Sequence, residues 1–558
     1  MRQIYSCRKV IFSLILFLFF LSFLFADQRS NEVDKLFAQW DKTTSPGCAL
    51  AVINDGQIIY KRGYGMAKLE DSIVMTPSKI FDIGSVSKQF TATCIVILAE
   101  QGKVSIDDDM RKYLPEMPKY EKPITISHLL HHTSGVRDYN SLLSLAGFRP
   151  DSDSPTVEEA LEIICKQKRL NFLPGEEYSY SNSGYFLLSC IVERVSGKSL
   201  NEFAQEHIFK PLGMTNTIFQ DDHTQIIPNR ATGYSPGPKG FKIDMSNWDE
   251  TGDGNIYTSV EDLFLWDQVF YSNKLGKPLM DNLHQVGVLN NGTKLDYALG
   301  LVIGEYKGLK TVSHGGSWAG FRAALVRFPE QKFSVICLAN LSTINPSRLC
   351  LRIADIYLAD QLKEAPKEQK KKLEPLTLSK QELEEKCGNY QDDKFGMWIT
   401  LSIKDEKLKM NLRSQELLLS PVSANRFQAI DAPLEAAIEF LPAVSGEPRQ
   451  ATLTMRGNEV FNLVKAPPLT PLTPAQLQEY CGVYESEELL KAVYQVSLEK
   501  DNLMAKARSL SKSSLKAVAP DKFTVEGINV EFVRGKGKRI TGFLLSVGRA
   551  GHIEFVKK

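Results

Sequence analysis

The chain has 558 residues, of which 43% are apolar and 24% are charged. At roughly 100–200 residues per domain this length predicts two to four domains, and the composition excludes a wholly disordered or fibrous protein. The 67 Lys and Arg residues balance 66 Asp and Glu residues, for a net charge of +1. Nucleic-acid binding depends on an excess of cationic side chains, so no nucleic-acid partner is expected.

The first 26 residues have the three parts of a secretory signal. Arg2, Arg8 and Lys9 precede an uncharged run over 10–25 made almost wholly of Ile, Leu and Phe, and a small residue and polar sequence follow it. The run is shorter than the roughly 20 residues of a membrane span. We therefore expect a signal peptide at 1–26 and an exported protein, periplasmic or secreted. An uncleaved N-terminal membrane anchor is the alternative, and it would be the chain's only membrane contact.

The next segments mix strand and helix patterns. Residues 49–60 (ALAVINDGQIIY) predict a hairpin, because Asp55-Gly56 supplies a turn with positive φ. Residues 85–101 predict a mostly buried helix that ends at Gly102.

Later segments of the large part continue this mixture. A capping box, Ser199-Leu-Asn-Glu202, predicts a helix that runs to Phe209, before Pro211. Residues 323–327 and 334–339 predict strands. Strands at both ends with helices between them indicate an α+β domain.

Two segments divide the chain. Residues 362–375 (LKEAPKEQKKKLEP) are charged and bounded by proline, and 466–474 (APPLTPLTP) contain four prolines, so both are predicted linkers. They leave a large domain at 27–361 and two small domains at 376–465 and 475–558.

The two small domains look like copies of one module. LEEKCGNY at 383–390 aligns with LQEYCGVY at 477–484, and 419–427 aligns with 515–523. Short alternating runs with a turn every eight to twelve residues predict small antiparallel β-barrels or sandwiches.

The cysteines after the signal do not form a metal or disulfide pattern. They are scattered, without a Cys-x-x-Cys pair, so we expect small buried apolar side chains rather than a disulfide scaffold. They are Cys48, Cys94, Cys165, Cys190, Cys337, Cys350, Cys387 and Cys481.

Ser85-Val-Ser-Lys88 opens the predicted buried helix. Residues three apart share one helix face, so the Lys88 amine can reach the Ser85 hydroxyl. A desolvated lysine with a lowered pKa can activate a serine nucleophile. Ser-x-x-Lys also occurs at 509–512 and 513–516, and a plain helix cap is the alternative at Ser85.

Two further motifs follow in the chain. In Tyr180-Ser-Asn182, a phenol hydrogen-bonded by lysine can act as a general base, and the Asn182 amide can orient a substrate carbonyl. The alternative is that Ser181 or Asn182 is simply the N-cap of a helix. In His314-Gly-Gly316-Ser317, glycine lets the backbone approach a ligand, and an exposed N–H can complete an oxyanion hole; a glycine-rich turn is the alternative.

Together the three motifs resemble those of the serine hydrolases of the class C β-lactamase and penicillin-binding-protein family: Ser-x-x-Lys, Tyr-x-Asn and Lys/His-x-Gly. Flanking sequence agrees, including FDIGS at 81–85, ITISHLLHHTSG at 124–135, LPGE at 173–176 and HGGSWAGF at 314–321. The resemblance covers roughly 33–359 and implies an antiparallel sheet flanked by helices. With two trailing barrels, the architecture resembles the D-aminopeptidases of that family, in which a barrel loop reaches the active site.

Three competing motifs are rejected. His128, His131 and His132 lack the intervening Glu of His-Glu-x-x-His and fall within the family's own His-Thr-Ser-Gly stretch, so a structural role is expected. Gly197-Lys-Ser199 lacks the first glycine of a phosphate loop. No Gly-x-Ser-x-Gly nucleophile elbow occurs.

The resemblance implies an exported serine hydrolase that acts on amide or ester bonds through an acyl-enzyme. Ser85 is the expected nucleophile, with Lys88 and Tyr180 moving its proton; which of the two is the acylation base is left open. The N–H groups of Ser85 and Ser317 would hold the oxyanion, and Asn182 would position the acyl group.

His314 and Gly316 complete the expected substrate site. Many family members carry lysine at the position of His314, and a neutral histidine binds a substrate carboxylate less well until the pH falls towards 6. No metal or cofactor is required. The expected partner is a small-molecule or peptide substrate, and cell-wall derivatives are among the candidates.

The sequence leaves the substrate open. A D-aminopeptidase, a D-alanyl-D-alanine carboxypeptidase and an esterase all fit, with β-lactamase as the alternative. The alternative to an enzyme is a non-catalytic protein that kept the fold and binds the cell wall or another ligand. The presence of all three motifs favours an enzyme.

Overall fold

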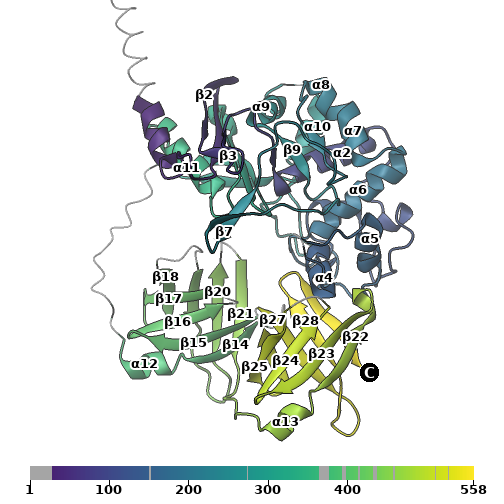
Figure 1. The fold of residues 1–558 in the computed structure, drawn as a ribbon, viewed down its shortest axis with the longest axis vertical. Helices are drawn as coiled ribbons and strands as arrows, with labels where there is room; N and C mark the ends of the chain where they lie inside the picture. The colour runs from purple at the N-terminus through teal and green to yellow at the C-terminus, as the bar shows by residue number, and fades with distance from the viewer. Residues whose placement is uncertain are drawn as a thin grey trace, which may run out of the picture.

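A computed structural model describes residues 28–149, 152–272, 274–363, 376, 378–392, 397–412, 415–430, 436–455, 459–508, 511–525 and 527–558. The expected signal at 1–26 and most of the expected linker at 362–375 lie outside these ranges. The large domain lies above two barrels that stand side by side (Figure 1). The chain therefore has the expected α+β domain followed by two antiparallel β-barrels.

The large domain is built on an antiparallel sheet of six strands. Their order across the sheet is β10 (Val302–Tyr306), β11 (Leu309–Trp318), β12 (Phe321–Phe328), β13 (Phe333–Ala339), β1 (Cys48–Asn54) and β2 (Gln57–Tyr64). The expected hairpin is present as β1 and β2, with positive φ at Asp55 and Gly56. The two expected later strands are β12 and β13.

Alternation along the strands gives the sheet two buried faces. In β1, Leu50 and Val52 point to the face covered by residues 28–37 and α11 (Pro346–Tyr357), whereas Ala49 and Ala51 point to the larger helical layer. Both faces are apolar because helices cover both.

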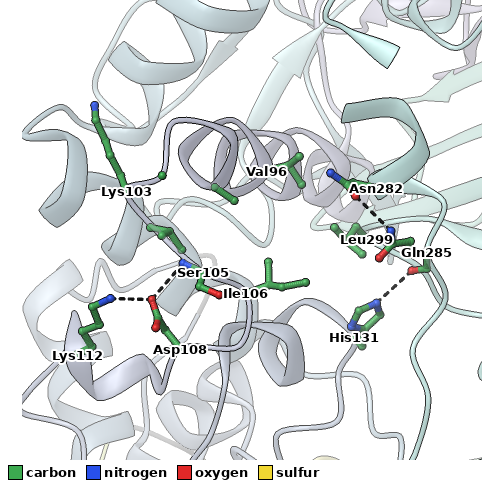
Figure 2. Close-up of a pocket in the computed structure, with 13 residues that line it drawn as sticks. Val96, Lys103, Ser105, Ile106, Asp108, Lys112, His131, Asn282, Gln285 and Leu299 are labelled. Carbon is green, nitrogen blue, oxygen red and sulfur yellow. Dashed lines mark hydrogen bonds and ion pairs between the residues drawn. The ribbon is translucent and has the colours of Figure 1, made fainter. Parts of the chain in front are cut away.

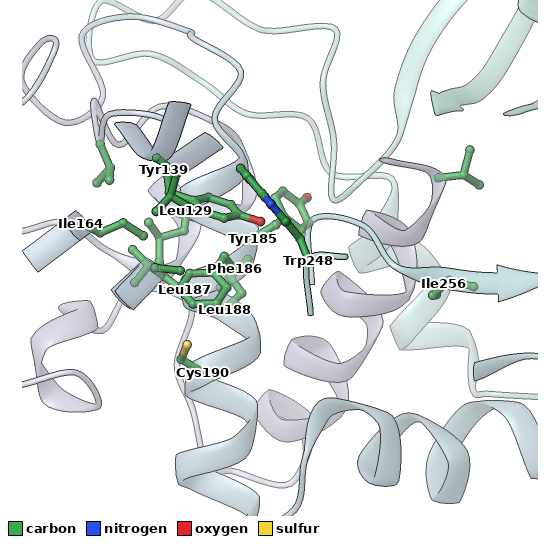
Figure 3. Close-up of a cluster of buried hydrophobic side chains, with 14 of the residues drawn as sticks. Leu129, Tyr139, Ile164, Tyr185, Phe186, Leu187, Leu188, Cys190, Trp248 and Ile256 are labelled. Carbon is green, nitrogen blue, oxygen red and sulfur yellow. The ribbon is translucent and has the colours of Figure 1, made fainter. Parts of the chain in front are cut away.

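The helical layer carries the first two sequence motifs, whereas the third lies on β11 of the sheet. The helices of this layer are α2 (Lys88–Glu100), α3 (Ile126–Leu130), α4 (Tyr139–Ala146), α5 (Val157–Cys165), α6 (Asn182–Ser196), α9 (Val260–Val269) and α10 (Lys277–Leu283). Short strand pairs complete the domain: β3 (Met66–Lys68) with β4 (Ile73–Val74), β5 (Phe81–Asp82) and β6 (Ile218–Phe219) with β9 (Ile256–Thr258), and β7 (Tyr234–Gly237) with β8 (Gly240–Ile243). Helix α6 lies across α2 and α3, and Figure 3 shows its Tyr185, Phe186 and Leu188 within the shared core.

The helix that begins after Ser199 extends further than the sequence predicts. Helix α7 (Leu200–Ala204) passes into a π-helical turn (Gln205–Phe209) and then α8 (Lys210–Leu212). Pro211 does not end the helix, because the wider π turn before it relieves the clash of the proline ring with the preceding turn. The backbone turns away at Gly213, with φ of 77°.

Each small domain contains a closed antiparallel barrel. The first is formed by β14 (Gly388–Asp392), β15 (Trp398–Lys404), β16 (Lys407–Leu412), β17 (Gln415–Pro421), β18 (Arg426–Ile430), β19 (Ala436–Phe440), β20 (Gln450–Met455) and β21 (Glu459–Lys465). The second is formed by β22 (Gly482–Ser486), β23 (Ala492–Glu499), β24 (Asn502–Ala507), β25 (Ser513–Ala519), β26 (Lys522–Val525), β27 (Ile528–Arg534), β28 (Ile540–Val547) and β29 (Ala550–Lys557).

The expected duplication extends to side-chain contacts. A short capped helix precedes each barrel, α12 (Lys380–Glu384) and α13 (Pro474–Gln478). The hydroxyls of Tyr390 and Tyr484 each donate to the carbonyl four residues earlier, at 3.0 and 2.7 Å.

The second barrel packs tightly on the large domain, beneath α4 (Figure 1). Its apolar core is continuous with that of the helical layer, and the Tyr494 hydroxyl donates to the Leu145 carbonyl at 2.8 Å. A buried ion pair joins Arg137 to Glu488 at 2.7 Å. The contact therefore fixes the second barrel relative to the segment that follows Arg137.

All eight cysteines of the described residues are free thiols, and five of them are buried. This agrees with their expected role as small apolar side chains. Within the described ranges, no helix is both long enough and apolar enough to cross a membrane.

Candidate active site

Ser85 and Lys88 lie where the chain enters the core. A 3₁₀ turn (Gly84–Ser87) carries Ser85 and leads directly into α2, so the expected helix begins with a tighter turn. Lys88 is fully buried, and its Nζ lies 3.2 Å from Ser85 Oγ. The amine is thus within hydrogen-bonding distance of the hydroxyl.

Two further oxygens hold the Lys88 amine. Nζ donates to Asn182 Oδ1 at 2.9 Å and to the Asp253 carbonyl at 2.6 Å. Burial lowers the pKa of Lys88 to about 8, because desolvation outweighs the opposing charge of Asp253, and the Arg549 cation lowers it further. A substantial share of Lys88 is therefore neutral near pH 8 and can accept a proton.

Tyr180 lies against Lys88 by its ring face rather than by its hydroxyl. Lys88 Nζ is 4.8 Å from the ring centroid. Burial raises the pKa of Tyr180 well above its ordinary value, although Ser85 and the Arg549 cation oppose this effect. Its buried hydroxyl has no hydrogen-bond partner of normal geometry within the described ranges. The expected lysine–phenol hydrogen bond is absent from this arrangement, and Tyr180 is a neutral phenol.

Asn182 begins α6, but its side chain does not cap the helix. Ser181 occupies the N-cap position without a capping hydrogen bond and donates instead to the Val136 carbonyl at 3.0 Å. The Asn182 amide oxygen faces Lys88, and its backbone N–H donates to Asp138 Oδ2 at 2.8 Å. The Tyr-x-Asn segment is therefore oriented by Asp138 rather than by a helix cap.

The glycines of the third motif allow β11 to pass against the nucleophile turn. A Cβ at Gly316 would lie 1.9 Å from the Ile83 carbonyl oxygen and 3.3 Å from Ser85 N. A Cβ at Gly84, where φ is 50°, would lie 2.8 Å from Ser317 N. This contact brings the backbone at Ser85 close to the backbone at Ser317, and these two residues carry the N–H groups expected to form an oxyanion hole.

His314 is buried on the same strand and is neutral. Its Nδ1 lies 2.7 Å from the Gly315 carbonyl and must carry the proton, so Nε2 accepts from the Tyr297 hydroxyl at 3.1 Å. Burial, with the Lys88 cation, lowers the pKa of His314 to about 4. The expected protonation towards pH 6 is therefore wrong, because the reference pKa ignores this burial.

The second barrel contributes a cation to the site. Arg549 lies in the turn between β28 and β29, with its guanidinium 4.8 Å from the Tyr180 ring centroid and 3.8 Å from Asp138 Oδ2. The Arg549 carbonyl accepts from Asp138 N at 3.2 Å and from Asn171 Nδ2 at 2.8 Å. A barrel loop thus reaches the active site, in agreement with the architecture that the sequence resembles.

Sequence patterns missed several members of this cluster. Asp138, Asp253, Tyr297 and Arg549 belong to none of the three motifs, although each contacts a motif residue. For Asp138 a signal was available: it lies three residues after the HHTSG segment, and it is the N-cap of α4. The others carry no local pattern.

The histidines rejected as metal ligands have other contacts. His128 completes a capping box with Thr125, and His131 bridges the Ser127 and Gln285 carbonyls. His132 packs on the Tyr180 ring at 4.2 Å. Over the described part of the chain, no group of three His, Cys, Asp or Glu side chains is placed to hold a metal ion.

Two of the pockets in the large domain lie beside α2. The larger, of about 480 Å³, lies between the end of α2 and α10, and Figure 2 shows His131 and Gln285 on its wall; it contains no residue of the three motifs. The smaller, of about 40 Å³, is lined by Ser85, Asn182 and Ser317. The smaller pocket is therefore the one associated with the chemistry.

Comparison with known proteins agrees with this geometry. A family model described as Beta-lactamase matches residues 33–357. Penicillin-binding protein 4* of Bacillus subtilis is 29% identical over 437 residues, covering 72% of this chain and 93% of that protein. A D-aminopeptidase of Gluconobacter oxydans is 27% identical over 456 residues, covering 81% and 82%.

A solved structure shows the same fold. The octameric penicillin-binding protein homologue from Pyrococcus abyssi aligns with a TM-score of 0.56 and 24% identity, covering 78% of this chain and 99% of that one. With the family model spanning more than half of the sequence, the chain belongs to the β-lactamase family and is a serine hydrolase of the β-lactamase and penicillin-binding-protein type.

Proposed function

We propose that this protein is an exported amidase or esterase that forms an acyl-enzyme at Ser85, acting on small amino-acid derivatives as D-aminopeptidases do. The observation that carries the proposal is the Lys88 amine, 3.2 Å from Ser85 Oγ with a pKa of about 8. A serine hydroxyl becomes an effective nucleophile when a neutral base of this kind lies beside it.

In the proposed acylation, neutral Lys88 takes the proton of Ser85 Oγ as the oxygen bonds to the substrate carbonyl carbon. The N–H groups of Ser85 and Ser317 stabilise the oxyanion. The proton then passes, by way of the Tyr180 hydroxyl, to the departing amine or alcohol as its bond to carbon breaks. Lys88 is the better first acceptor, because burial holds Tyr180 in its protonated form.

Deacylation reverses these proton movements. A water molecule attacks the acyl carbonyl carbon and passes its proton through the Tyr180 hydroxyl to neutral Lys88. As the bond from carbon to Ser85 Oγ breaks, Lys88 returns that proton to Oγ, and the acid product leaves. Asn182, which shares the Lys88 amine, is placed to orient the acyl group through its amide N–H₂.

The state of His314 separates the substrate classes. β-Lactams and D-alanyl-D-alanine termini present a carboxylate, which a cationic residue on this strand would bind. His314 is buried, and its pKa of about 4 leaves it uncharged at neutral pH. Amides and esters without a terminal carboxylate are therefore the favoured substrates, and carboxypeptidase or β-lactamase activity is expected to be weak.

A substrate panel tests the proposal. We expect D-alanine amide and short esters to be hydrolysed with kcat/KM at least tenfold above that for a D-alanyl-D-alanine peptide or a chromogenic cephalosporin. Efficient cephalosporin hydrolysis would contradict the substrate assignment.

Sequencing of protein from an exporting cell should give Asp27 as the first residue; an intact Met1 in the membrane fraction would contradict cleavage.

A further inference from the structure

Glu250 is a buried carboxyl group that nothing in the proposed mechanism uses. It is 3% exposed and lines the small pocket together with Ser85, Asn182 and Ser317. Neither of its carboxyl oxygens has a hydrogen-bond partner among the residues that the structure describes. Buried carboxyl groups in folded proteins are normally paired, because an unpaired one loses its hydration without gaining a hydrogen bond.

The backbone holds Glu250 in this position. The Asn255 side-chain amide donates to the carbonyls of Glu250 and Trp248, both at 2.9 Å. The backbone at Glu250 is thus tied to the strand that begins at Ile256, and the side chain is buried in the wall of the pocket. A fixed acceptor without a protein partner indicates a partner that arrives with the substrate.

The other lining residues favour a cation. Trp248 lies 5.6 Å from Trp318 and 6.5 Å from Tyr139, measured between ring centroids, and all three line the pocket. Figure 3 shows Tyr139 and Trp248 at the edge of the buried core. Asp253 adds a second carboxyl group, and no Lys, Arg or His of the described residues lines this pocket. Aromatic faces combined with carboxylates are a typical environment for an ammonium group.

We propose that Glu250 and this aromatic wall bind the free ammonium group of the acyl part of the substrate, so that the enzyme selects unblocked amino-acyl amides and esters. The inference rests on the proposed function, since it takes Ser85 as the nucleophile. The pocket adjoins Asn182 and Ser317, which is the side assigned to the acyl group. Its volume of about 40 Å³ has room for an ammonium group.

The electrostatics are consistent with a cationic ligand. Burial raises the pKa of Glu250 to about 8, and Asp253, Asp249 and Glu159 add repulsion. A cation bound beside the carboxyl group would offset both effects and favour its ionised form.

The test compares D-alanine methyl ester with N-acetyl-D-alanine methyl ester at pH 7, where an α-amine with a pKa of about 7.7–8.0 is mostly protonated. We expect the wild-type protein to show kcat/KM at least tenfold higher for the free amine. Glu250→Gln, which keeps the side-chain shape, should lose at least tenfold on the free amine, mainly through KM, and less than threefold on the acetylated ester. Glu193→Gln, at an exposed position of α6, is the matched control and should change neither.

Two results would overturn the inference. One is equal hydrolysis of the two esters by the wild-type protein, a measurement that does not depend on any variant folding. The other is an equal loss on both esters in Glu250→Gln, which would mean a structural role. The result would differ if the proposed function itself were wrong. Either the wild-type protein would hydrolyse neither these esters nor phenyl acetate, or Ser85→Ala would not abolish their hydrolysis.

Discussion

Arg549 links the second barrel to the ionisation of the catalytic groups. Its guanidinium lies 4.8 Å from the Tyr180 ring centroid, and its charge lowers the pKa of both Tyr180 and Lys88. Arg549→Met removes the charge and keeps much of the side-chain volume. Arg549→Lys keeps the charge and serves as the matched control.

The size of the effect follows from distance and exposure. The Arg549 guanidinium and Lys88 Nζ each lie 4.8 Å from the Tyr180 ring centroid, so the two charges are at most about 9.6 Å apart. At that separation two charges interact by about 0.4 kcal/mol at the dielectric constant of water and about 1.7 kcal/mol at an effective value of 20. The Arg549 side chain is 42% exposed, so the upper end of this range does not apply. About 1 kcal/mol corresponds to roughly 0.7 of a pKa unit.

The assay is the pH dependence of kcat/KM for a neutral short ester. In the proposed acylation neutral Lys88 accepts the proton, so activity should rise with pH through the pKa of Lys88, which is about 8 in the wild-type protein. Without the Arg549 cation this pKa rises, and the acid limb should move up by about half to one pH unit. Activity at pH 7 should fall roughly three- to tenfold, while activity above pH 9.5 approaches the wild-type value.

The shape of the profile decides the outcome. Arg549→Lys should keep the wild-type midpoint. If Arg549→Met lowers activity equally at every pH, the residue acts only by positioning the turn between β28 and β29, and the electrostatic reasoning is refuted. An unchanged profile refutes it as well.

Three further predictions follow from the site and the barrel contact. Ser85→Ala should lower ester hydrolysis by about 10³-fold or more without lowering the melting temperature; residual activity within tenfold of wild type would exclude Ser85 as nucleophile. His314→Lys should raise cephalosporin turnover relative to a neutral ester, and an unchanged ratio would remove the carboxylate argument. Glu488→Gln leaves the buried Arg137 cation without its anion, so urea unfolding should show a loss of about 3 kcal/mol; a loss below about 1 kcal/mol would mean that the ion pair contributes little.

The sequence predicted the parts of the site that are local. Ser85 and Lys88 lie one turn apart, so their spacing alone brings them together, and the glycines beside Ser317 mark a close backbone approach. The hairpin at 49–60 and the duplicated barrels were predicted for the same reason, because turn residues and strand alternation are short-range signals.

The features of the site that the sequence did not predict depend on tertiary packing. Arg549 reaches Tyr180 only because the second barrel packs beneath α4, and no pattern near position 549 encodes that contact. Glu250 is an ordinary acidic residue in sequence, and its unpaired state arises from the surrounding fold. The pKa of His314 likewise follows from burial, which a reference value cannot include.

The central claim is that Ser85 forms the acyl-enzyme, and mass spectrometry of trapped protein tests it most directly. The protein is quenched in acid during hydrolysis of a slow ester and digested, and the acylated peptide is sequenced. The account predicts one added acyl group on the peptide that contains Ser85, absent from Ser85→Ala. An acyl adduct on another residue would contradict the claim. So would turnover without an acyl adduct at Ser85, provided that a fluorophosphonate labels Ser85 under the same conditions.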